Sequence, residues 1–475
     1  MRFCSTFSIG GDSLSVMSKT FRAWDVDQVW LLPPSIRDFV PSGHLAHFVR
    51  ETVRGDLDLS TILSSYVEER GYPPYHPGMM VALLLYGYSR GVYSSRQLAR
   101  GCEERVDFMA VTGLQRPDFR TISEFRRRHL AALGSLFVQV LRLCRAAGLV
   151  QLGHVALDGT KLRGNASKHK AMSYGHLREA ERRLAAEVAS WFARAEAIDA
   201  AENETCGRDR RGDELPAWVA DKQARLLKIR AAKAALEAEA AEAPAGAAEA
   251  GAAEAGAAKG GDGEGPGPSN GMTDHGRPRR AVGGGPPDKA QRNFTDPDSR
   301  IQKTRDGLIQ GYNAQIAVDG AHQIILAQRV VTNGADYAAL MPLLRATRRN
   351  CGATPKELSA DAGFCNEANL AALDRFRSCR AYLAPGRARH GTTPGTSERA
   401  IKPGSRMAAM AAKLRRAGWR SRYRLRKQIV EPVFGQIKQA RGFRQFLLRS
   451  LQKVRQEWAM ICTAHNILKL AKAKA

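Results

Sequence analysis

Residues 311–331 read Gly-Tyr-Asn-Ala-Gln-Ile-Ala-Val-Asp-Gly-Ala-His-Gln-Ile-Ile-Leu-Ala-Gln-Arg-Val-Val. Two runs with strand composition, 311–319 and 322–331, are separated by Gly320, which predicts a β-hairpin. Earlier in the chain, His154-Val-Ala-Leu-Asp158-Gly-Thr160 is a short apolar run ending in Asp-Gly. This run predicts a buried strand that carries a carboxylate at its end.

After the hairpin, helical and strand patterns alternate along the chain. Residues 336–349 and 366–375 have helical periodicity, whereas 356–361 and 379–384 are short strand-like runs. A helix around Glu431 and a final helix over about 451–470 close the chain. The order βββαβαβα predicts an α/β (α+β) fold, a mixed sheet with helices on its faces.

The N-terminal part shows helical periodicity from His44 onward, which predicts an all-α module. Thr121-Ile-Ser-Glu124 has the form of a capping box and predicts the start of a long helix that runs through Leu141. Arg126, Arg127 and Arg128 near its start could lie along a DNA backbone or form a solvated arginine-rich face.

A long insert separates the first two strands. Helix-forming residues dominate 173–242 and are interrupted at 207–216, which predicts an antiparallel helix pair. Residues 243–290 consist mainly of Ala, Gly, Glu and Pro and are predicted to be a disordered linker. The predicted division of the chain is an extension at 1–40, an all-helical DNA-binding domain at 41–148, the first part of the core at 149–172, the helical insert at 173–242, the linker at 243–290, and the rest of the core with basic helices at 291–475.

The charge of the chain points to nucleic acid. Residues 375–475 contain 25 Lys and Arg against three Asp and Glu, in a chain of net charge +26 and pI about 10.1. DNA or RNA is the favoured partner and an anionic membrane surface the second. No apolar run is long enough to span a bilayer, and the eight cysteines form no zinc or disulfide pattern, so we expect a cytoplasmic protein.

Glu431 stands alone in this basic stretch. Ile429, Val433 and Ile437 recur every four residues, which predicts a helix, and Lys438 lies two turns after Glu431 on nearly the same face. One reading is a metal ligand beside a phosphate-binding ammonium. The other is a solvated ion pair on an amphipathic helix.

Three carboxylates fit two-metal phosphoryl transfer: Asp158 after the first strand, Asp361 after the fourth, and Glu431. Oxygen ligands favour Mg²⁺ or Mn²⁺, and the ends of neighbouring strands can meet across a long insert. Asp158 and Asp361 could alternatively open simple turns. Asp319 is better explained by the hairpin turn, and the segment 296–300 by a turn or cap, with a DNA contact as a second role.

These residues resemble the DDE transposases of bacterial insertion sequences, in the branch with an InsH-type helical N-terminal domain. The similar segments are 44–133, Leu157-Asp-Gly-Thr-Lys161, Asp296-Pro-Asp-Ser-Arg300, Gly311-Tyr-Asn-Ala-Gln315, Ser359-Ala-Asp-Ala-Gly-Phe364 and Val430-Glu-Pro-Val-Phe-Gly-Gln-Ile-Lys438.

The resemblance implies a ribonuclease-H-like core in which Asp158, Asp361 and Glu431 hold two Mg²⁺ ions, with Mn²⁺ as a substitute. It implies hydrolysis at the transposon ends, followed by attack of the freed 3′-OH on target DNA. It also implies a homodimer that joins two terminal inverted repeats, with Lys438 on a phosphate at the transposon end.

One signature is shifted. The family places tyrosine and arginine seven and four residues before the glutamate, and here Arg424 and Lys427 hold those positions, with Tyr423 one step earlier. One residue rotates a helical side chain by about 100°. Tyr423, Arg424 and Lys427 are nevertheless expected to contact DNA.

Two other functions would share either the metal chemistry or the DNA partner of a transposase. A non-cleaving DNA-binding protein derived from a transposase would keep the basic surface, and a ribonuclease-H-like nuclease would keep the sheet and metals. The presence of all three carboxylates favours an enzyme, and the separate helical module favours a transposase.

Overall fold

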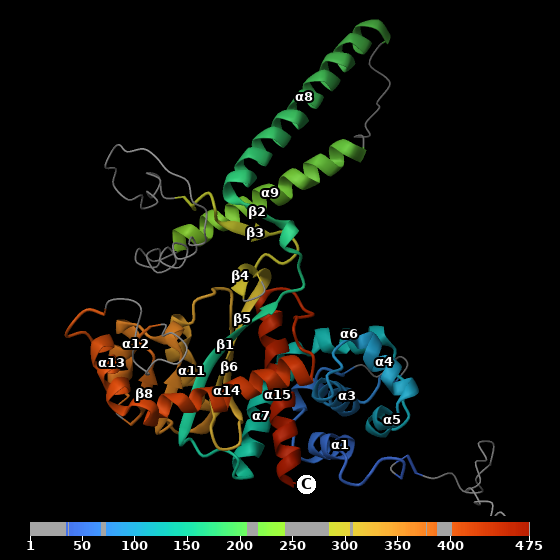
Figure 1. The fold of residues 1–475 in the computed structure, drawn as a ribbon. Coiled ribbons are helices and arrows are strands. Elements are labelled where there is room, and N and C mark those ends of the chain that lie inside the picture. Colours follow the sequence, from blue (N-terminus) through green and yellow to red (C-terminus); the bar gives the residue numbers. More distant parts are fainter. Residues whose placement is uncertain are drawn as a thin grey trace, which may run out of the picture.

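The computed structural model describes residues 35–36, 38–67, 73–206, 217–242, 285–304, 307–376, 378–386 and 401–474. A helical N-terminal part lies beside a mixed sheet, and a two-helix arm extends away from one end of that sheet (Figure 1). The predicted fold class, an all-helical region followed by a mixed sheet with helices, is confirmed.

The N-terminal part is built only of helices among its described residues. Its central helix, α3, is apolar on all sides and almost wholly buried, which is why its sequence shows a continuous apolar run instead of one apolar face. The helices are α1 (Leu45–Gly55), α2 (Ser60–Leu63), α3 (Pro77–Ser89), α4 (Ser95–Glu104), α5 (Val106–Thr112), α6 (Phe119–Arg128) and α7 (Leu130–Ala146).

The predicted capping box is wrong. Helix α6 begins at Phe119, where the Asp118 side chain accepts a hydrogen bond from the Arg120 amide, so Thr121 and Glu124 lie inside the helix. The chain then leaves helical geometry at His129 before α7 begins. The start was misplaced because Asp118 offers a capping oxygen three residues before Thr121. The segment predicted to be one long helix therefore consists of two helices, α6 and α7.

The sheet has the strand order β4-β5-β1-β7-β8, with β6 also paired to β5. β1 is antiparallel to β5 and parallel to β7, which is in turn parallel to β8. The pairing of β4 with the first half of β5 was not predicted, and it makes β5 longer than the predicted strand. The strands are β1 (His154–Arg163), β4 (Arg300–Thr304), β5 (Gly307–Asp319), β6 (Ile325–Val331), β7 (Glu357–Ala360) and β8 (Arg380–Leu383).

The C-terminal helices join the sheet to the N-terminal helices. Helix α15 packs against both α7 and β6, so both parts of the molecule share one buried core. Asn466 of α15 accepts from the Ile325 amide and donates to the Ile325 carbonyl, 2.9 Å each, and so pairs backbone groups of edge strand β6. The helices are α11 (Leu340–Cys351), α12 (Glu367–Asp374), α13 (Arg406–Ala417), α14 (Leu425–Gly435) and α15 (Leu451–Lys474).

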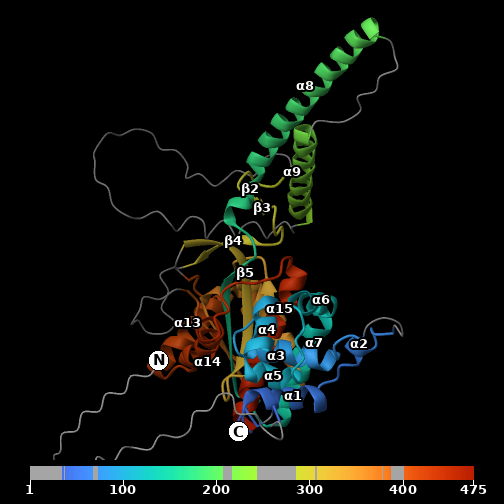
Figure 2. The same cartoon turned by 90° about the vertical axis from the view of Figure 1, so that its right-hand side faces the viewer.

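The insert forms an arm that is joined to the rest of the molecule by two stems, the strands β2 (Ala171–Ser173) and β3 (Gln291–Asn293), which lie side by side (Figures 1 and 2). These strands are antiparallel and carry helices α8 (Tyr174–Cys206) and α9 (Ala217–Glu242). The helices bury a small core of their own, which confirms the predicted helix pair. Most of the predicted linker, 243–284, lies outside the described residues.

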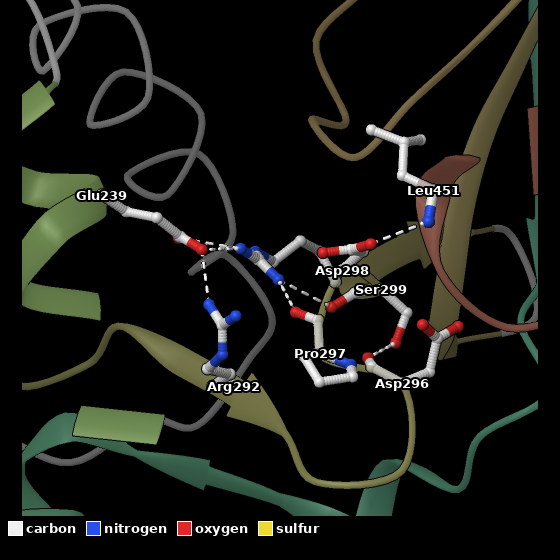
Figure 3. A network of polar contacts seen from close by, with 8 residues as sticks. Glu239, Arg292, Asp296, Pro297, Asp298, Ser299 and Leu451 are labelled. Atoms are coloured by element: carbon white, nitrogen blue, oxygen red, sulfur yellow. Dashed lines mark hydrogen bonds and ion pairs between the residues drawn. The ribbon is translucent and has the colours of Figure 1, made fainter. Parts of the chain in front are cut away.

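A polar network anchors this arm at the end of the sheet (Figure 3). Glu239 of α9 binds Arg292 of β3 at 2.5 Å and Arg300 of β4 at 2.8 Å. Beside it, Asp298 accepts from the Leu451 amide at 2.8 Å and caps the first turn of α15. The predicted turn or cap at 296–300 is confirmed, and the helix that it caps lies about 150 residues further along the chain.

Candidate active site

Asp158 of β1 and Asp361, the residue after β7, lie at the same end of two neighbouring parallel strands. The register of β1 with β7 ends at the pair Leu157 and Ala360, and Asp158 and Asp361 are the next residues of the two segments. In sheets with parallel strands, ligands bind at the carboxyl ends of the strands. Asp158 does not end its strand as predicted, because β1 continues to Arg163 along β5; it marks only the end of pairing with β7.

Both carboxyl groups are largely buried, and this changes their ionisation. Burial raises the pKa of Asp158 to about 7, Asp361 and Asp336 add to the effect, and the Arg426 guanidinium opposes it. Burial also raises the pKa of Asp361, followed by repulsion from Asp336. Three carboxylates close enough to repel one another form a site that a divalent cation would neutralise.

Arg426 connects Asp158 with Glu431. Its Nη1 lies 2.8 Å from Asp158 Oδ2, and its Nη2 lies 3.9 Å from Glu431 Oε1. Burial works against the charge of Arg426, but neighbouring groups, led by Asp158, raise the pKa of its guanidinium. Glu431 itself is 53% exposed, on the turn of α14 that follows Arg426.

Arg426 was not among the predicted site residues, although the sequence contains a signal for it. Tyr423 and Arg426 keep the three-residue spacing of the family's tyrosine and arginine, and both are shifted one residue away from Glu431. The structure keeps them together, because Tyr423 hydrogen-bonds Arg426, and burial raises the pKa of the Tyr423 phenol. The shift therefore moves the pair without removing Tyr423 from the site. Arg424 and Lys427 are exposed and stay predicted DNA contacts.

Lys438 reaches the same face of β1 as Asp158. Its Nζ lies 3.0 Å from Thr160 Oγ1, and Thr160 is two residues after Asp158 on the strand, so both side chains point to one side. Helix α14 ends at Gly435, and a π-helical turn, Gln436–Ala440, carries Lys438.

The backbone hydrogen-bond ladder of α14 loses one bond directly after Glu431. Pro432 has no amide hydrogen, so the Gln428 carbonyl lacks its usual helical partner. Gln323, in the turn between β5 and β6, donates to this carbonyl at 3.2 Å. The hairpin thus contacts the helix that carries Glu431.

One of the predicted DNA contacts is wrong. Arg126 is only 7% exposed, and its guanidinium donates to Ser95 Oγ, the Tyr93 carbonyl and Tyr88 Oη inside the helical domain. It cannot lie along a DNA backbone in this fold. Arg127 pairs with Glu124, and Arg128 donates to the Ser65 carbonyl; both are exposed and remain predictions.

The other singled-out residues have structural roles. Asp319 is buried and accepts from the amides of Leu152 at 2.8 Å and Ala321 at 2.9 Å, as expected for a turn residue. Trp191 and Trp218 pack edge to face between α8 and α9, with ring centroids 6.2 Å apart.

A second buried polar cluster was not predicted. His154 lies between Glu357 (3.0 Å) and Ser359 (2.9 Å), and Arg422 donates to Glu357 at 2.5 Å. The arrangement has the residue types of a nucleophilic triad, but Ser359 is fully buried, so no substrate reaches it. Its effect is to tie the segment before α14 to the sheet.

The donor set suits a hard divalent cation, since it consists of carboxylate oxygens alone. As the side chains stand, no three Asp, Glu, His or Cys side chains in the described ranges converge closely enough to ligate one ion. A metal ion held by Asp158 and Glu431 would compete with the Arg426 guanidinium, which lies 2.8 Å from Asp158 and 3.9 Å from Glu431.

Two family models match the chain. Residues 34–128 match the Transposase domain (DUF772), and residues 283–467 match the Transposase DDE domain. The second match begins after β1, so it contains Asp361 and Glu431 but not Asp158, which the sheet brings beside Asp361. No curated protein and no solved structure matches the chain. None of the described helices combines the length and apolarity needed to cross a membrane.

The two matched ranges cover more than half of the chain and include helices α1 to α6 of its N-terminal part and most of its sheet. Enzymes with the DDE domain are polynucleotidyl transferases that bind DNA and use divalent metal ions. The chain belongs to the DDE transposases, with a DUF772 N-terminal domain, and its activity is DNA transposition.

Proposed function

We propose that this transposase cuts DNA at the ends of its own element and joins the freed 3′-OH to target DNA, with Asp158, Asp361 and Glu431 as the ligands of two Mg²⁺ ions. Mn²⁺ is expected to replace Mg²⁺. The observation that carries the proposal is the placement of Asp158 and Asp361 at the end of one parallel strand pair, beneath the helix that bears Glu431.

The protein's own groups bind and orient the DNA. Bound divalent ions would stabilise charge on the attacking and leaving oxygens. Lys438, near Asp158 on the same face, would hold a phosphate of the transposon end, and Arg426 would bind a second phosphate once it leaves Asp158. Tyr423, Arg424 and Lys427 would extend this contact along the backbone.

The N-terminal helical domain is proposed to recognise the terminal inverted repeats, with Arg127 and Arg128 on the backbone. Two ends must be joined in one reaction, which favours a homodimer in the synaptic complex. The proposed place of action is the cytoplasm of a bacterium, on the nucleoid.

The proposal is tested with labelled DNA carrying the element's end, incubated with Mg²⁺, Mn²⁺ or chelator. Metal-dependent nicking at the end, followed by joining to a target plasmid, supports it. Nicking without joining indicates a nuclease, and end binding by folded protein without any nicking indicates a regulatory DNA-binding protein.

The affinity for end DNA should fall steeply with salt, since phosphate contacts release counterions. Lys438→Ala is expected to reduce the slope of log K against log salt by about 1, as for loss of one phosphate contact. Fluorescence anisotropy between about 50 and 200 mM salt measures this slope. Lys356→Ala, at the opposite end of β7 from Asp361, is the matched control and should keep the wild-type slope. An unchanged slope for Lys438→Ala would remove Lys438 from the DNA contacts.

A further inference from the structure

Asp336 lies beside the two strand-end aspartates but has no role in the proposed ligand set. A Cβ atom placed on Gly363 would be 3.2 Å from Asp336 Oδ2 and 3.3 Å from Asp361 Oδ1. The two carboxylates therefore flank one small space. The charge of Asp336 also contributes to the raised pKa of both Asp158 and Asp361.

We propose that Asp336 is a fourth carboxylate of the catalytic centre, which binds divalent metal together with Asp361, and that Asn313 and Gln315 are positioning residues that aim it. The inference rests on the proposed metal site and adds a residue to it.

The amides of β5 fix one oxygen of Asp336. Asn313 Nδ2 donates to Asp336 Oδ1 at 2.7 Å, and Gln315 Nε2 donates to the same oxygen at 2.6 Å. Asn313 and Gln315 are alternate residues of β5, so their side chains share one face of the sheet. Among the described residues, none donates to Oδ2, the oxygen that lies beside Gly363. One oxygen is held while the other is available to a ligand, as for carboxylates oriented by outer-shell hydrogen bonds.

The position of Asp336 in the chain suggests a simpler role, which its contacts do not support. Asp336 precedes a short 3₁₀ turn, Tyr337–Ala339, and an aspartate there would ordinarily cap the turn with its side chain. Its side chain makes no capping hydrogen bond. The carboxylate instead accepts from the two amides through Oδ1 and places Oδ2 beside Gly363.

Two neighbouring features fit a ligand at this place. A Cβ atom on Gly159 would lie 2.7 Å from Asp336 Oδ1, so the glycine after Asp158 leaves the space that Asp336 occupies. Within the described part of the chain, the buried Oε1 of Gln315 has no hydrogen-bond partner. Buried polar atoms are rarely left unpaired, and a metal-bound water beside Asp336 would supply the missing donor.

The test measures metal binding directly. Mn²⁺ is titrated into the full-length protein bound to end DNA, and free Mn²⁺ is followed by electron paramagnetic resonance. Asp336→Asn is expected to weaken Mn²⁺ binding by at least about tenfold, and Asn313→Ala by about tenfold, the scale of outer-shell substitutions. The Mn²⁺ concentration for half-maximal cleavage should rise by the same factors. Asp374→Asn removes an exposed carboxylate and is the matched control, with unchanged binding.

The outcomes separate this inference from the proposed function. Wild-type Mn²⁺ affinity in Asp336→Asn, with binding lost in Asp158→Asn, overturns the role of Asp336 and leaves the proposed site intact. Unchanged affinity in Asp158→Asn as well overturns both. Thermal unfolding in chelator shows whether each variant is folded.

A measurement on the wild type covers the case in which Asp336→Asn does not fold. Fe²⁺ bound in place of Mg²⁺, with ascorbate and peroxide, cuts the polypeptide close to the ion. Cuts near 158, 361 and 336 are expected. Cuts near 158 and 361 without one near 336 would refute the inference.

Discussion

Glu431→Gln is expected to lower the rate of end cleavage by at least about 10³-fold while binding of end DNA stays within about threefold of the wild type. Glutamine keeps the size of the side chain but removes the charge that a metal ligand needs, and loss of charge stabilisation at a reacting centre costs about 10² to 10³ in rate or more. Glu431 is half exposed, so the substitution should not unfold the protein. Single-turnover cleavage of a labelled end, with anisotropy for binding, measures both quantities.

Asp374→Asn on α12 is the control, because this carboxylate is exposed and forms an ion pair with Arg406. It should cleave at the wild-type rate. Cleavage by Glu431→Gln at the wild-type rate would exclude Glu431 from the metal ligands, whatever the outcome at Asp158 and Asp361.

Glu457→Gln is expected to make the protein more resistant to unfolding at neutral and alkaline pH. Glu457 lies within α15, 1% exposed, and burial raises its pKa to about 7, although the Leu447 and Leu448 amides donate to it. A carboxyl group whose pKa is raised in the folded state binds more protons there than in the unfolded chain. The contribution of this proton binding to the free energy of unfolding is therefore fully present below about pH 4.5, and it is lost as the pH rises to about 7.

The difference in unfolding free energy between Glu457→Gln and wild type should grow by about 1.4 kcal/mol per pH unit across this window, to on the order of 3 kcal/mol above pH 7. Denaturant unfolding in chelator at several pH values measures it. Glu104→Gln on α4 changes an exposed carboxylate and sets the baseline. A difference that does not vary with pH would show that folding does not raise the pKa of Glu457.

The sequence predicted the elements that local patterns specify. The hairpin, the strands before Asp158 and Asp361, and the helix of Glu431 each follow from the alternation or spacing of apolar residues, which the fold then uses. Asp158 and Asp361 could be predicted to lie close together, because the order of the strands in the sheet determines which strand ends are neighbours.

The remaining site residues depend on contacts that no local pattern contains. Asp336 was predicted to be the first residue of a helix, and only the folded structure brings Asn313 and Gln315 of β5 to it. Arg126 and Arg127 are consecutive arginines, yet rotation by about 100° per residue buries one and exposes the other. Sequence alone treats the two as equivalent.

The paired stems of the arm, β2 and β3, allow the length of the insert between them to vary among related transposases. Strands β2 and β3 hold the two ends of the insert together, with Ala171 opposite Asn293. Once a loop's ends are joined, doubling its length costs only about 0.6 kcal/mol of closure entropy. Chain length can therefore be gained or lost between the stems with little effect on the sheet that carries the aspartates, and relatives of this transposase are free to differ most in size at this one place.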